Sequence, residues 1–327
     1  VSFVSASHLL NPGGAGLVSY RVNKTPKESG VRINDLFFPG YPLSKGPEGQ
    51  YGAFISIPLD ASGSLQAEII ARAGTGNEAK QSISLRVNPK RWRHDKMKLS
   101  DNFVSQVNDK FPEMRQGDPL QTFLAINQKM RLANHERVRQ ACAVSQPQPL
   151  WTGAFQRFPG GTMARFGDKR SYILQNRTVD EQVHLGEDLA SVVNAPVPAA
   201  NNGVVVMAEP LGIYGNTVML DHGMGIFSMY SHLSRLDVKT GERVEKGKAV
   251  GLTGTTGLAL GDHLHYSVLV HGEFVNPVEW WDAHWFKDQV EKVWAQTAAS
   301  EGEKNQAATP QTASPQAPAG KGKKRQR

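Results

Sequence analysis

Histidine and acidic residues form two short clusters in the C-terminal half of the chain. His184 and Asp188 lie four residues apart in the first cluster, and His263 and His265 lie two apart in the second. A further histidine, His232, lies between the clusters. Imidazole nitrogen and carboxylate oxygen are ligand types that Zn2+ accepts, and three protein ligands leave a fourth position open for water. These residues predict a hydrolytic metal site rather than a structural one.

The spacing within each cluster indicates how the side chains are presented. Alternate residues of a strand point to the same face, so His263 and His265 project side by side if residues 264–270 are extended, as their β-rich composition predicts. Gly186 permits a bend between His184 and Asp188, which lets both side chains converge from an irregular segment. The two patterns together are much stronger evidence than either pattern alone.

Several short motifs around these clusters, and the order in which they occur, resemble the lysostaphin-type (LytM-type) zinc metallopeptidases that cut peptides in bacterial peptidoglycan. The resemblance extends over about residues 151–285. Apart from the histidine clusters, it rests on Arg165-Phe-Gly167, Asn216 to Gly223, Tyr230 to Leu233, Val244 to Gly251, Thr253 to Gly257 and Asn276-Pro277. It implies Zn2+ as the cofactor and peptidoglycan as the substrate.

Each site residue takes a role from this resemblance. It implies that His184, Asp188 and His265 bind zinc, while His232 and His263 are the uncoordinated catalytic histidines. Zinc lowers the pKa of bound water from about 15.7 toward about 7, so a nucleophile is available at neutral pH. His263, beside the ligand His265, is the better candidate for the general base, and His232 then faces the developing oxyanion. The two histidines could exchange these roles.

The function that the resemblance implies is a zinc-dependent endopeptidase acting on stem peptides or cross-links of peptidoglycan. One alternative is a catalytically silent LytM-like factor that binds the wall and activates an amidase, but such factors usually lack one or more site residues, and this chain keeps all five. Another alternative is a carrier domain, because Val244 to Gly251 resembles the hairpins of biotinyl and lipoyl modules. The chain lacks the Asp-Lys-Ala or Met-Lys-Met turn at which such modules are modified.

Three other histidines of the same half are expected to have structural roles. His222 and His271 each lie beside glycine at a predicted hairpin turn, and His284 lies in an aromatic run. The glycines between residues 247 and 261 do not form the Gly-x-Gly-x-x-Gly pattern of a nucleotide site. Short β-rich runs between glycines instead predict an antiparallel β-sheet domain over residues 151–290.

Length and hydrophobic patterning predict more than one domain. The chain has 327 residues, more than the usual single-domain range of about 100 to 200 residues. Residues 1–90 contain several short runs of alternating apolar and polar residues separated by turn residues, which predicts an immunoglobulin-like β-sandwich. It carries no catalytic cluster, so we expect a spacer, a docking module for an envelope partner, or a purely structural domain. The predicted fold class is mainly β.

Residues 91–150 change to a period near four and predict a helical connecting segment. Ser100 or the residue after it can cap a first helix that ends near Pro112, and a second helix starts at Pro119 and carries apolar residues to Met130. Packing against a neighbouring domain is the favoured role for both helices. A regulatory lid over the active-site groove is the alternative.

The end of the chain differs in composition. Residues 296–327 are rich in Ala, Gln, Ser, Pro and Gly and end in a basic run, which predicts a disordered tail. Five charges of the formal net +7 lie in the last seven residues, so the rest of the chain has a net charge near +2, which by count indicates no basic face suited to nucleic acid. The single cysteine, Cys142, excludes an intrachain disulfide.

The location of the protein is inferred from its substrate. The sequence begins at Val1 rather than at Met and has no apolar span of 18 residues, so we expect a fragment or processed form whose signal peptide or inner-membrane anchor would lie upstream. A peptidoglycan hydrolase works outside the inner membrane, and the multidomain layout resembles envelope enzymes of Gram-negative bacteria. These arguments favour the periplasm.

The same layout favours one bond in the substrate. Gram-negative members of the family cut direct cross-links between D-alanine and meso-diaminopimelate, which is the bond we expect here. Three loops are expected to set specificity around the groove, Ala195 to Asn202, Leu211 to Asn216 and Thr253 to Asp262, because they flank the predicted strands.

Overall fold

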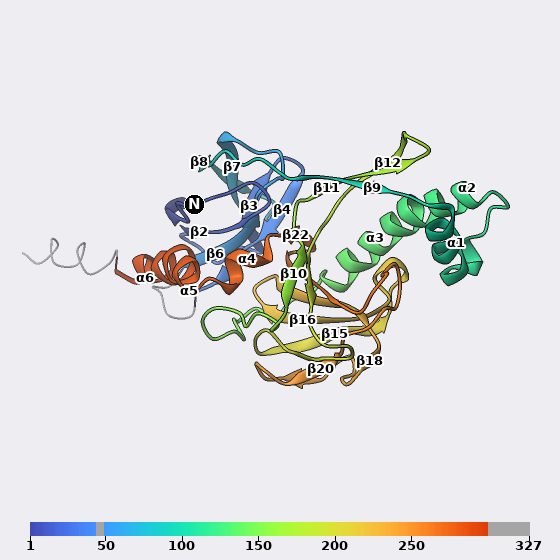
Figure 1. The fold of residues 1–327 in the computed structure, drawn as a ribbon. Coiled ribbons are helices and arrows are strands. Elements are labelled where there is room, and N and C mark those ends of the chain that lie inside the picture. Colours follow the sequence, from blue (N-terminus) through green and yellow to red (C-terminus); the bar gives the residue numbers. More distant parts are fainter. Residues whose placement is uncertain (44–48, 300–327) are drawn as a thin grey trace, which may run out of the picture.

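Two four-stranded antiparallel sheets form the N-terminal part of the computed structural model, which describes residues 1–43 and 49–299 (Figure 1). The strands are β1 (Ser2–Ala6), β2 (Ala15–Arg21), β3 (Glu28–Ile33), β4 (Leu36–Pro39), β5 (Tyr41–Pro42), β6 (Gln50–Ser56), β7 (Gly63–Arg72) and β8 (Glu78–Val87). The strand orders are β1-β2-β6-β5 and β4-β3-β7-β8. With β4 as an additional edge strand, this is the order of an immunoglobulin-type sandwich. The predicted β-sandwich is confirmed.

The central strands of the first sheet are buried on both faces. Every residue of β6, and all of β2 except Arg21, lies in the interior. One face packs on the second sheet, and the other is covered by the C-terminal half of the chain, where Trp280 contacts Phe54 with ring centroids 6.0 Å apart. The sandwich is therefore tied to the rest of the molecule through a shared apolar core.

The connection between the two halves contains a strand that the sequence did not predict. β9 (His94–Lys98) pairs in parallel with β11 (Lys169–Leu174), and β12 (Arg177–Val183) completes a three-stranded sheet. The prediction of a wholly helical segment over residues 91–150 was wrong here. The sequence His-Asp-Lys-Met-Lys has no strong strand propensity, so β9 owes its conformation to pairing with a distant segment.

The first predicted helix of the connection is present. α1 (Asp101–Lys110) is capped by Ser100, whose side chain accepts a hydrogen bond from the backbone N–H of Phe103 at 3.1 Å. The short helix η1 (Pro112–Met114) follows it. None of the helices in the described part of the chain has the length and apolar character needed to span a membrane.

The second predicted helix continues beyond Met130, where its pattern of apolar residues was predicted to end. α2 (Pro119–Leu124) runs without a break through the π-helical turn η2 (Ala125–Met130) into α3 (Arg131–Ala141). α3 is mostly polar, so its apolar period was too weak to predict. It docks through polar contacts, because the Asn134 side chain accepts from the N–H of Ile213 at 2.9 Å and His135 contacts the Tyr214 hydroxyl at 3.0 Å.

An eight-stranded antiparallel sheet forms the centre of the C-terminal part, as the sequence predicted. Its path is β10-β13-β21-β17-β16-β15-β19, with β22 paired to β21. The strands are β10 (Gly161–Ala164), β13 (Glu187–Ala190), β15 (Gly203–Pro210), β16 (Asn216–Gly223), β17 (Ile226–Leu233), β19 (Arg243–Val244), β21 (Leu264–Val270) and β22 (Glu273–Val275). A second small sheet contains β14 (Pro196–Pro198), β20 (Ala249–Leu252) and β18 (Arg235–Leu236), and η3 (Gly212–Tyr214) precedes β16.

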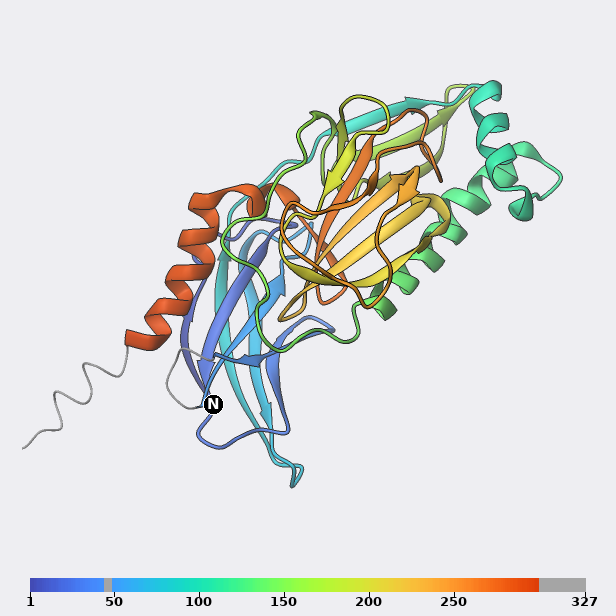
Figure 2. The same ribbon diagram turned by 90° about the horizontal axis from the view of Figure 1, so that it is seen from below.

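The chain then returns to the sandwich through four short helical segments. These are α4 (Pro277–Trp281), α5 (Ala283–Phe286), η4 (Lys287–Glu291) and α6 (Lys292–Ala299). Figure 2 shows α6 alongside the N-terminal strands, and the Gln289 side chain accepts hydrogen bonds from the N–H groups of His8 and Leu9, both at 2.9 Å. Helix α6 extends four residues into the segment predicted as a disordered tail. The rest of that segment lies outside the described residues.

A buried carboxylate lies where α4 meets the sandwich. Glu279 is 7% exposed and accepts hydrogen bonds from the Asn11 side chain at 3.0 Å and the N–H of Ala15 at 2.9 Å. Burial raises the pKa of Glu279 to about 6, although both hydrogen bonds and the charge of Lys90 act in the opposite direction.

This shift predicts a pH dependence of stability. A carboxyl group whose pKa rises on folding binds its proton more tightly in the folded state, so its contribution to stability falls as pH rises from about 4.5 to about 6. This difference in pKa corresponds to about 2 kcal/mol of unfolding free energy. Urea unfolding should therefore show that the unfolding free energy of wild type falls by about 2 kcal/mol relative to that of Glu279→Gln when the pH is raised from about 4 to about 7. The exposed Glu245→Gln is the control, and a parallel pH profile for wild type and Glu279→Gln would contradict the prediction.

Candidate metal centre

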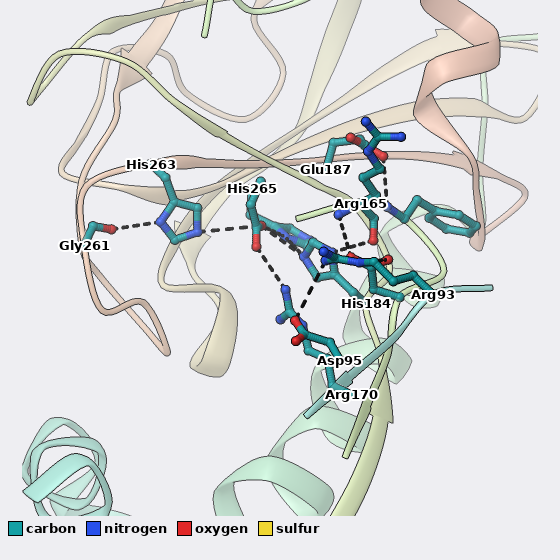
Figure 3. Close-up of polar contacts among 12 residues, drawn as sticks. Arg93, Asp95, Arg165, Arg170, His184, Glu187, Gly261, His263 and His265 are labelled. Atoms are coloured by element: carbon teal, nitrogen blue, oxygen red, sulfur yellow. Dashed lines mark hydrogen bonds and ion pairs between the residues drawn. The ribbon is translucent and has the colours of Figure 1, made fainter. Parts of the chain in front are cut away.

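The three predicted ligands, His184, Asp188 and His265, come together in one cluster, and Figure 3 shows His184 and His265 among their polar contacts. β13 and β21 are neighbours, and their pairing places Asp188 directly opposite His265. His184 lies in the irregular stretch between β12 and β13. Its Nε2 atom is 3.0 Å from Asp188 Oδ1 and 3.1 Å from His265 Nδ1, and those two atoms are 2.8 Å apart. The sequence expected Asp188 in an irregular segment, but it lies on a strand.

The hydrogen bonds behind the two imidazoles decide which nitrogen carries the proton. His184 Nδ1 is 3.0 Å from the carbonyl oxygen of Arg165, which can only accept, so Nδ1 is the protonated nitrogen. The Ser267 hydroxyl donates to the carbonyl of Leu185 at 2.8 Å and therefore accepts from His265 Nε2 at 3.2 Å. The nitrogens that face each other, His184 Nε2 and His265 Nδ1, are thus the unprotonated ones.

This arrangement fits a metal cation. In the neutral imidazoles, two nitrogen lone pairs and a carboxylate oxygen converge within 4.8 Å of one another, and no proton is left to lie between them. Donor atoms of a tetrahedral zinc site lie about 3.3 Å apart, which is close to the separations in this cluster. Nitrogen and carboxylate donors are the types that Zn2+ accepts. A divalent cation would remove the mutual repulsion of the three atoms.

Surrounding residues hold the ligands in place. Arg170 of β11 donates to Asp188 Oδ2 at 3.2 Å, which leaves Oδ1 for the cluster. The loop that carries the Arg165 carbonyl is fixed by Asp168, which accepts from the N–H of Arg165 at 2.9 Å and pairs with Arg93. Gly186 lies so close to His265 that a Cβ atom there would be 2.6 Å from Nε2. Such outer contacts orient ligands and set their tautomers in metal sites.

The two histidines predicted to be uncoordinated lie next to this cluster. His263 immediately precedes β21, and His232 follows Ser231, which is paired with His265 across β17 and β21. The ring centroids of His232 and His263 are 4.9 Å apart. Each ring donates from Nδ1 to a backbone carbonyl, His232 to Thr256 at 2.9 Å and His263 to Gly261 at 2.8 Å. In His232 this leaves Nε2 available to the cavity, while His263 Nε2 lies 3.6 Å from Asp188 Oδ1.

His232 has a backbone conformation that is unusual for a strand. Its φ angle is +63°, in the left-handed region, which typically costs a non-glycine residue about 1–3 kcal/mol. Such conformations persist where the surrounding structure enforces them. Here the Asn216 side chain donates to the carbonyl of Leu233 at 3.0 Å, and so does the Thr256 hydroxyl at 2.8 Å. These bonds fix the chain directly after His232.

Burial and neighbouring charges make the two histidines inequivalent. Burial, together with His265 and His263, holds the pKa of His232 well below its ordinary value. Burial also lowers the pKa of His263, but the Asp188 carboxylate and the Gly261 carbonyl outweigh it, and the pKa lies above its ordinary value. Burial would raise the pKa of Asp188, but its contacts with three histidines hold it well below the usual range.

A cavity of about 310 Å³ opens above the cluster. The five predicted site residues line it together with residues of β9, the helices and two loops, including Met97, Phe103, Phe123, Arg131, Ile213, Tyr214, Leu258 and Asp262. The loops Leu211 to Asn216 and Thr253 to Asp262 contribute to its wall as predicted. The third predicted loop, Ala195 to Asn202, contributes no described residue to that wall and contains β14 instead.

The predicted helices both pack on the C-terminal part and form one side of the cavity. Lys110, at the end of α1, donates from Nζ to the carbonyls of Thr255 at 2.8 Å, Gly257 at 3.2 Å and Ala259 at 2.6 Å. Three carbonyls around one ammonium group hold the loop against the helix. The favoured role, packing against a neighbouring domain, is confirmed, and the regulatory lid stays a prediction.

The other histidines lie away from the cluster. His222 is buried in β16, where it contacts the Asn202 carbonyl and the Ser228 hydroxyl, both at 2.7 Å, so its predicted place at the turn was off by a few residues. His271 lies at the predicted turn and stacks on Tyr41. The side chain of His284 is 97% exposed, so packing in the aromatic run does not account for it.

Comparison with known proteins identifies the part of the chain that carries this site. Residues 182–277 match the model of Peptidase family M23. The chain is 37% identical over 130 residues to the peptidoglycan DD-endopeptidase ShyA of Vibrio cholerae, covering 38% of this chain and 30% of that protein. It is 42% identical over 96 residues to ShyC of the same organism, covering 29% and 22%. The chain thus spans less than a third of the length of these relatives.

A solved structure extends the likeness in fold beyond the M23 residues. A protein from Pseudomonas aeruginosa described as a peptidase M23 aligns with a TM-score of 0.51 and 22% identity, covering 83% of this chain and 94% of that chain. At this identity the likeness concerns the fold alone. Because the alignment covers 83% of this chain, the shared fold extends well beyond residues 182–277.

Sequence reasoning missed three residues of the site. Ser267 follows His263 and His265 in the same alternating series, so the strand period that paired those histidines also predicts its position. Arg170 and Arg131 reach the site from β11 and α3, far from the histidine clusters in sequence. No local pattern marks either arginine, because long-range packing brings them to the cavity.

The metal ligands can be tested directly. We predict that the purified protein binds about one zinc ion per chain and that Asp188→Ala and His265→Ala lose it, because each removes one of three converging donors. Elemental analysis measures the metal content. Asp262→Ala, which changes another carboxylate of the cavity wall, should keep the zinc. Full occupancy in Asp188→Ala or His265→Ala would remove that residue from the ligand set.

Proposed function

We propose that this protein is a zinc-dependent endopeptidase that hydrolyses peptide cross-links or stem peptides of bacterial peptidoglycan. The observation that carries the proposal is the convergence of three metal-type donors beside two uncoordinated histidines in one cavity. The names of the relatives, peptidoglycan DD-endopeptidases, support the substrate class. For such a substrate we propose a location in the periplasm or cell envelope, where the sandwich would dock a partner or serve as a spacer.

The residues of the cavity divide the chemistry between them. His184 Nε2, Asp188 Oδ1 and His265 Nδ1 would hold the zinc ion, which when bound supplies a Lewis acid and an acidified water. His232 keeps its Nε2 atom available to the cavity, and His263 Nε2 faces Asp188 Oδ1 at 3.6 Å, beside the donor cluster. One of them accepts the proton of the attacking water and passes it to the leaving amine. The other donates a hydrogen bond to the carbonyl oxygen as negative charge develops on it.

The catalytic histidines should separate metal binding from turnover. We predict that His232→Ala and His263→Ala keep zinc and lose about 10²- to 10³-fold in kcat, because a proton acceptor or an oxyanion donor is removed. Zinc content and the rate of muropeptide cleavage by chromatography are the two readouts. His284→Ala, an exposed histidine outside the cavity, is the matched control and should change neither. A near-normal rate in His232→Ala or His263→Ala would refute the role of that residue.

The bond we propose is the one between D-alanine and meso-diaminopimelate. Purified zinc-loaded protein should convert cross-linked muropeptide dimers to monomers and leave glycan strands and the lactyl amide intact, as mass spectrometry of the products would show. Release of peptide-free glycan would identify an amidase. Cleavage confined to glycyl bridges would show that the bond is wrong, and absence of any cleavage would favour a silent wall-binding factor.

A further inference from the structure

One guanidinium group of the cavity wall has no acidic partner among residues 1–43 and 49–299. Arg131, the first residue of α3, is partly buried and lines the same cavity as His232, His263 and the three metal-type donors. Its Nε and Nη2 atoms donate to the backbone carbonyl and the side-chain oxygen of Asn127, at 3.0 and 2.5 Å. A guanidinium has five N–H donors, so several remain for a ligand.

A buried polar relay fixes the position of this guanidinium. Asn127 is completely buried and donates from Nδ2 to Asp180 at 2.7 Å, which turns its side-chain oxygen toward Arg131. Asp180 is held in turn by the Gln128 side chain at 2.9 Å. Asn127 and Gln128 belong to the π-helical turn η2, a local irregularity that is frequent at functional sites. Arg131 is therefore oriented before any ligand binds.

The other charged groups of the cavity wall already have partners. Arg170 donates to Asp188, and Asp95 lies 3.8 Å from Arg93. Asp262 accepts from the hydroxyl of Thr253 and the N–H of Asn194. Arg131 thus differs from the rest of the charged wall, because its positive charge is not balanced by a carboxylate of the described residues.

The neighbourhood of Arg131 favours strong recognition of an anion. Aromatic side chains of Phe103, Phe123 and Tyr172 line the same cavity and reduce the access of water. A hydrogen bond between a guanidinium and a carboxylate is charge-assisted, and its planar geometry matches the two carboxylate oxygens. In a partly apolar cavity such a bond contributes more than it does at an exposed surface.

We propose that Arg131 binds a carboxylate of the peptide substrate, the one carried by the same carbon as the leaving amine. This inference rests on the proposed function and names the feature of the substrate that the cavity selects. In a cross-link between D-alanine and meso-diaminopimelate, the carbon that bears the cross-linked amine also bears a free carboxylate. A glycyl bridge offers no such group beside its scissile bond, so Arg131 would distinguish the two kinds of wall peptide.

The experiment compares two substrates that differ in this one group. Zinc-loaded full-length protein is given a cross-linked diaminopimelate dimer and the same dimer with that carboxylate converted to the carboxamide. Wild type should have a higher kcat/KM for the carboxylate dimer than for the carboxamide dimer. In Arg131→Met the kcat/KM for the carboxylate dimer should fall about 10- to 100-fold, while that for the carboxamide dimer should change little. Arg131→Lys, which keeps the charge, should recover part of the preference.

The controls separate recognition from folding. Arg137→Met changes an exposed arginine of the same helix, paired with Glu209 at the surface, and should leave both rates unchanged. The zinc content of Arg131→Met should equal that of wild type. Its melting temperature should fall, because the buried Asn127 loses two hydrogen bonds, but the variant should remain folded at the assay temperature. Equal losses on both dimers in Arg131→Met, or a wild type that does not distinguish the dimers, would overturn the inference.

Failure of the proposed function has a different signature. If wild type cuts neither dimer, the endopeptidase proposal fails, and binding of the two dimers by isothermal titration calorimetry decides the role of Arg131. Tighter binding of the carboxylate dimer that disappears in Arg131→Met supports the inference. Equal binding of the two dimers by wild type overturns it.

Discussion

Two imidazole nitrogens and one carboxylate oxygen face one another with no proton between them. The rest of this structure depends on this one constraint. His184, His265 and Asp188 can be held this close only because each has its outer side fixed, by the Arg165 carbonyl, the Ser267 hydroxyl and Arg170. Strand register supplies the alignment, since Asp188 and His265 are direct partners across β13 and β21. The cluster is preorganised for a cation, and much of the surrounding polar structure serves to keep it so.

The cavity above this cluster is lined by residues from inside and from outside the part of the chain that matches the M23 model. Residues 182–277 contain all five predicted site residues, whereas Phe103, Phe123 and Arg131 come from the helical connection. Arg170 also lies outside the matched residues. The three donor residues lie within the matched residues, and much of the opposite wall of the cavity comes from segments that precede them in the chain. This wall can therefore differ between proteins that share only the matched residues.

Several features of the site followed from the sequence because they depend on short-range geometry. The alternation of a strand brings His263 and His265 to one face. Gly186 was expected to provide a bend, but what the structure requires at this position is space, since a Cβ atom would lie 2.6 Å from His265 Nε2. Capping residues such as Ser100 mark where a helix begins. The β-sandwich and the antiparallel sheet were predicted for the same reason, since period-two patterns and turn residues are local signals.

Other features were decided only by the tertiary structure, because they depend on contacts between distant segments. β9 is a strand through its parallel pairing with β11, and α3 is held by polar contacts of Asn134 and His135 together with the single buried apolar residue Val138. Arg131 becomes a candidate for binding substrate only when α3 lies over the cavity. The sequence by itself determined the donor types, their spacing and the family that these residues resemble. Packing of the connecting segment determined the wall that faces them, since no local period encodes which surfaces meet.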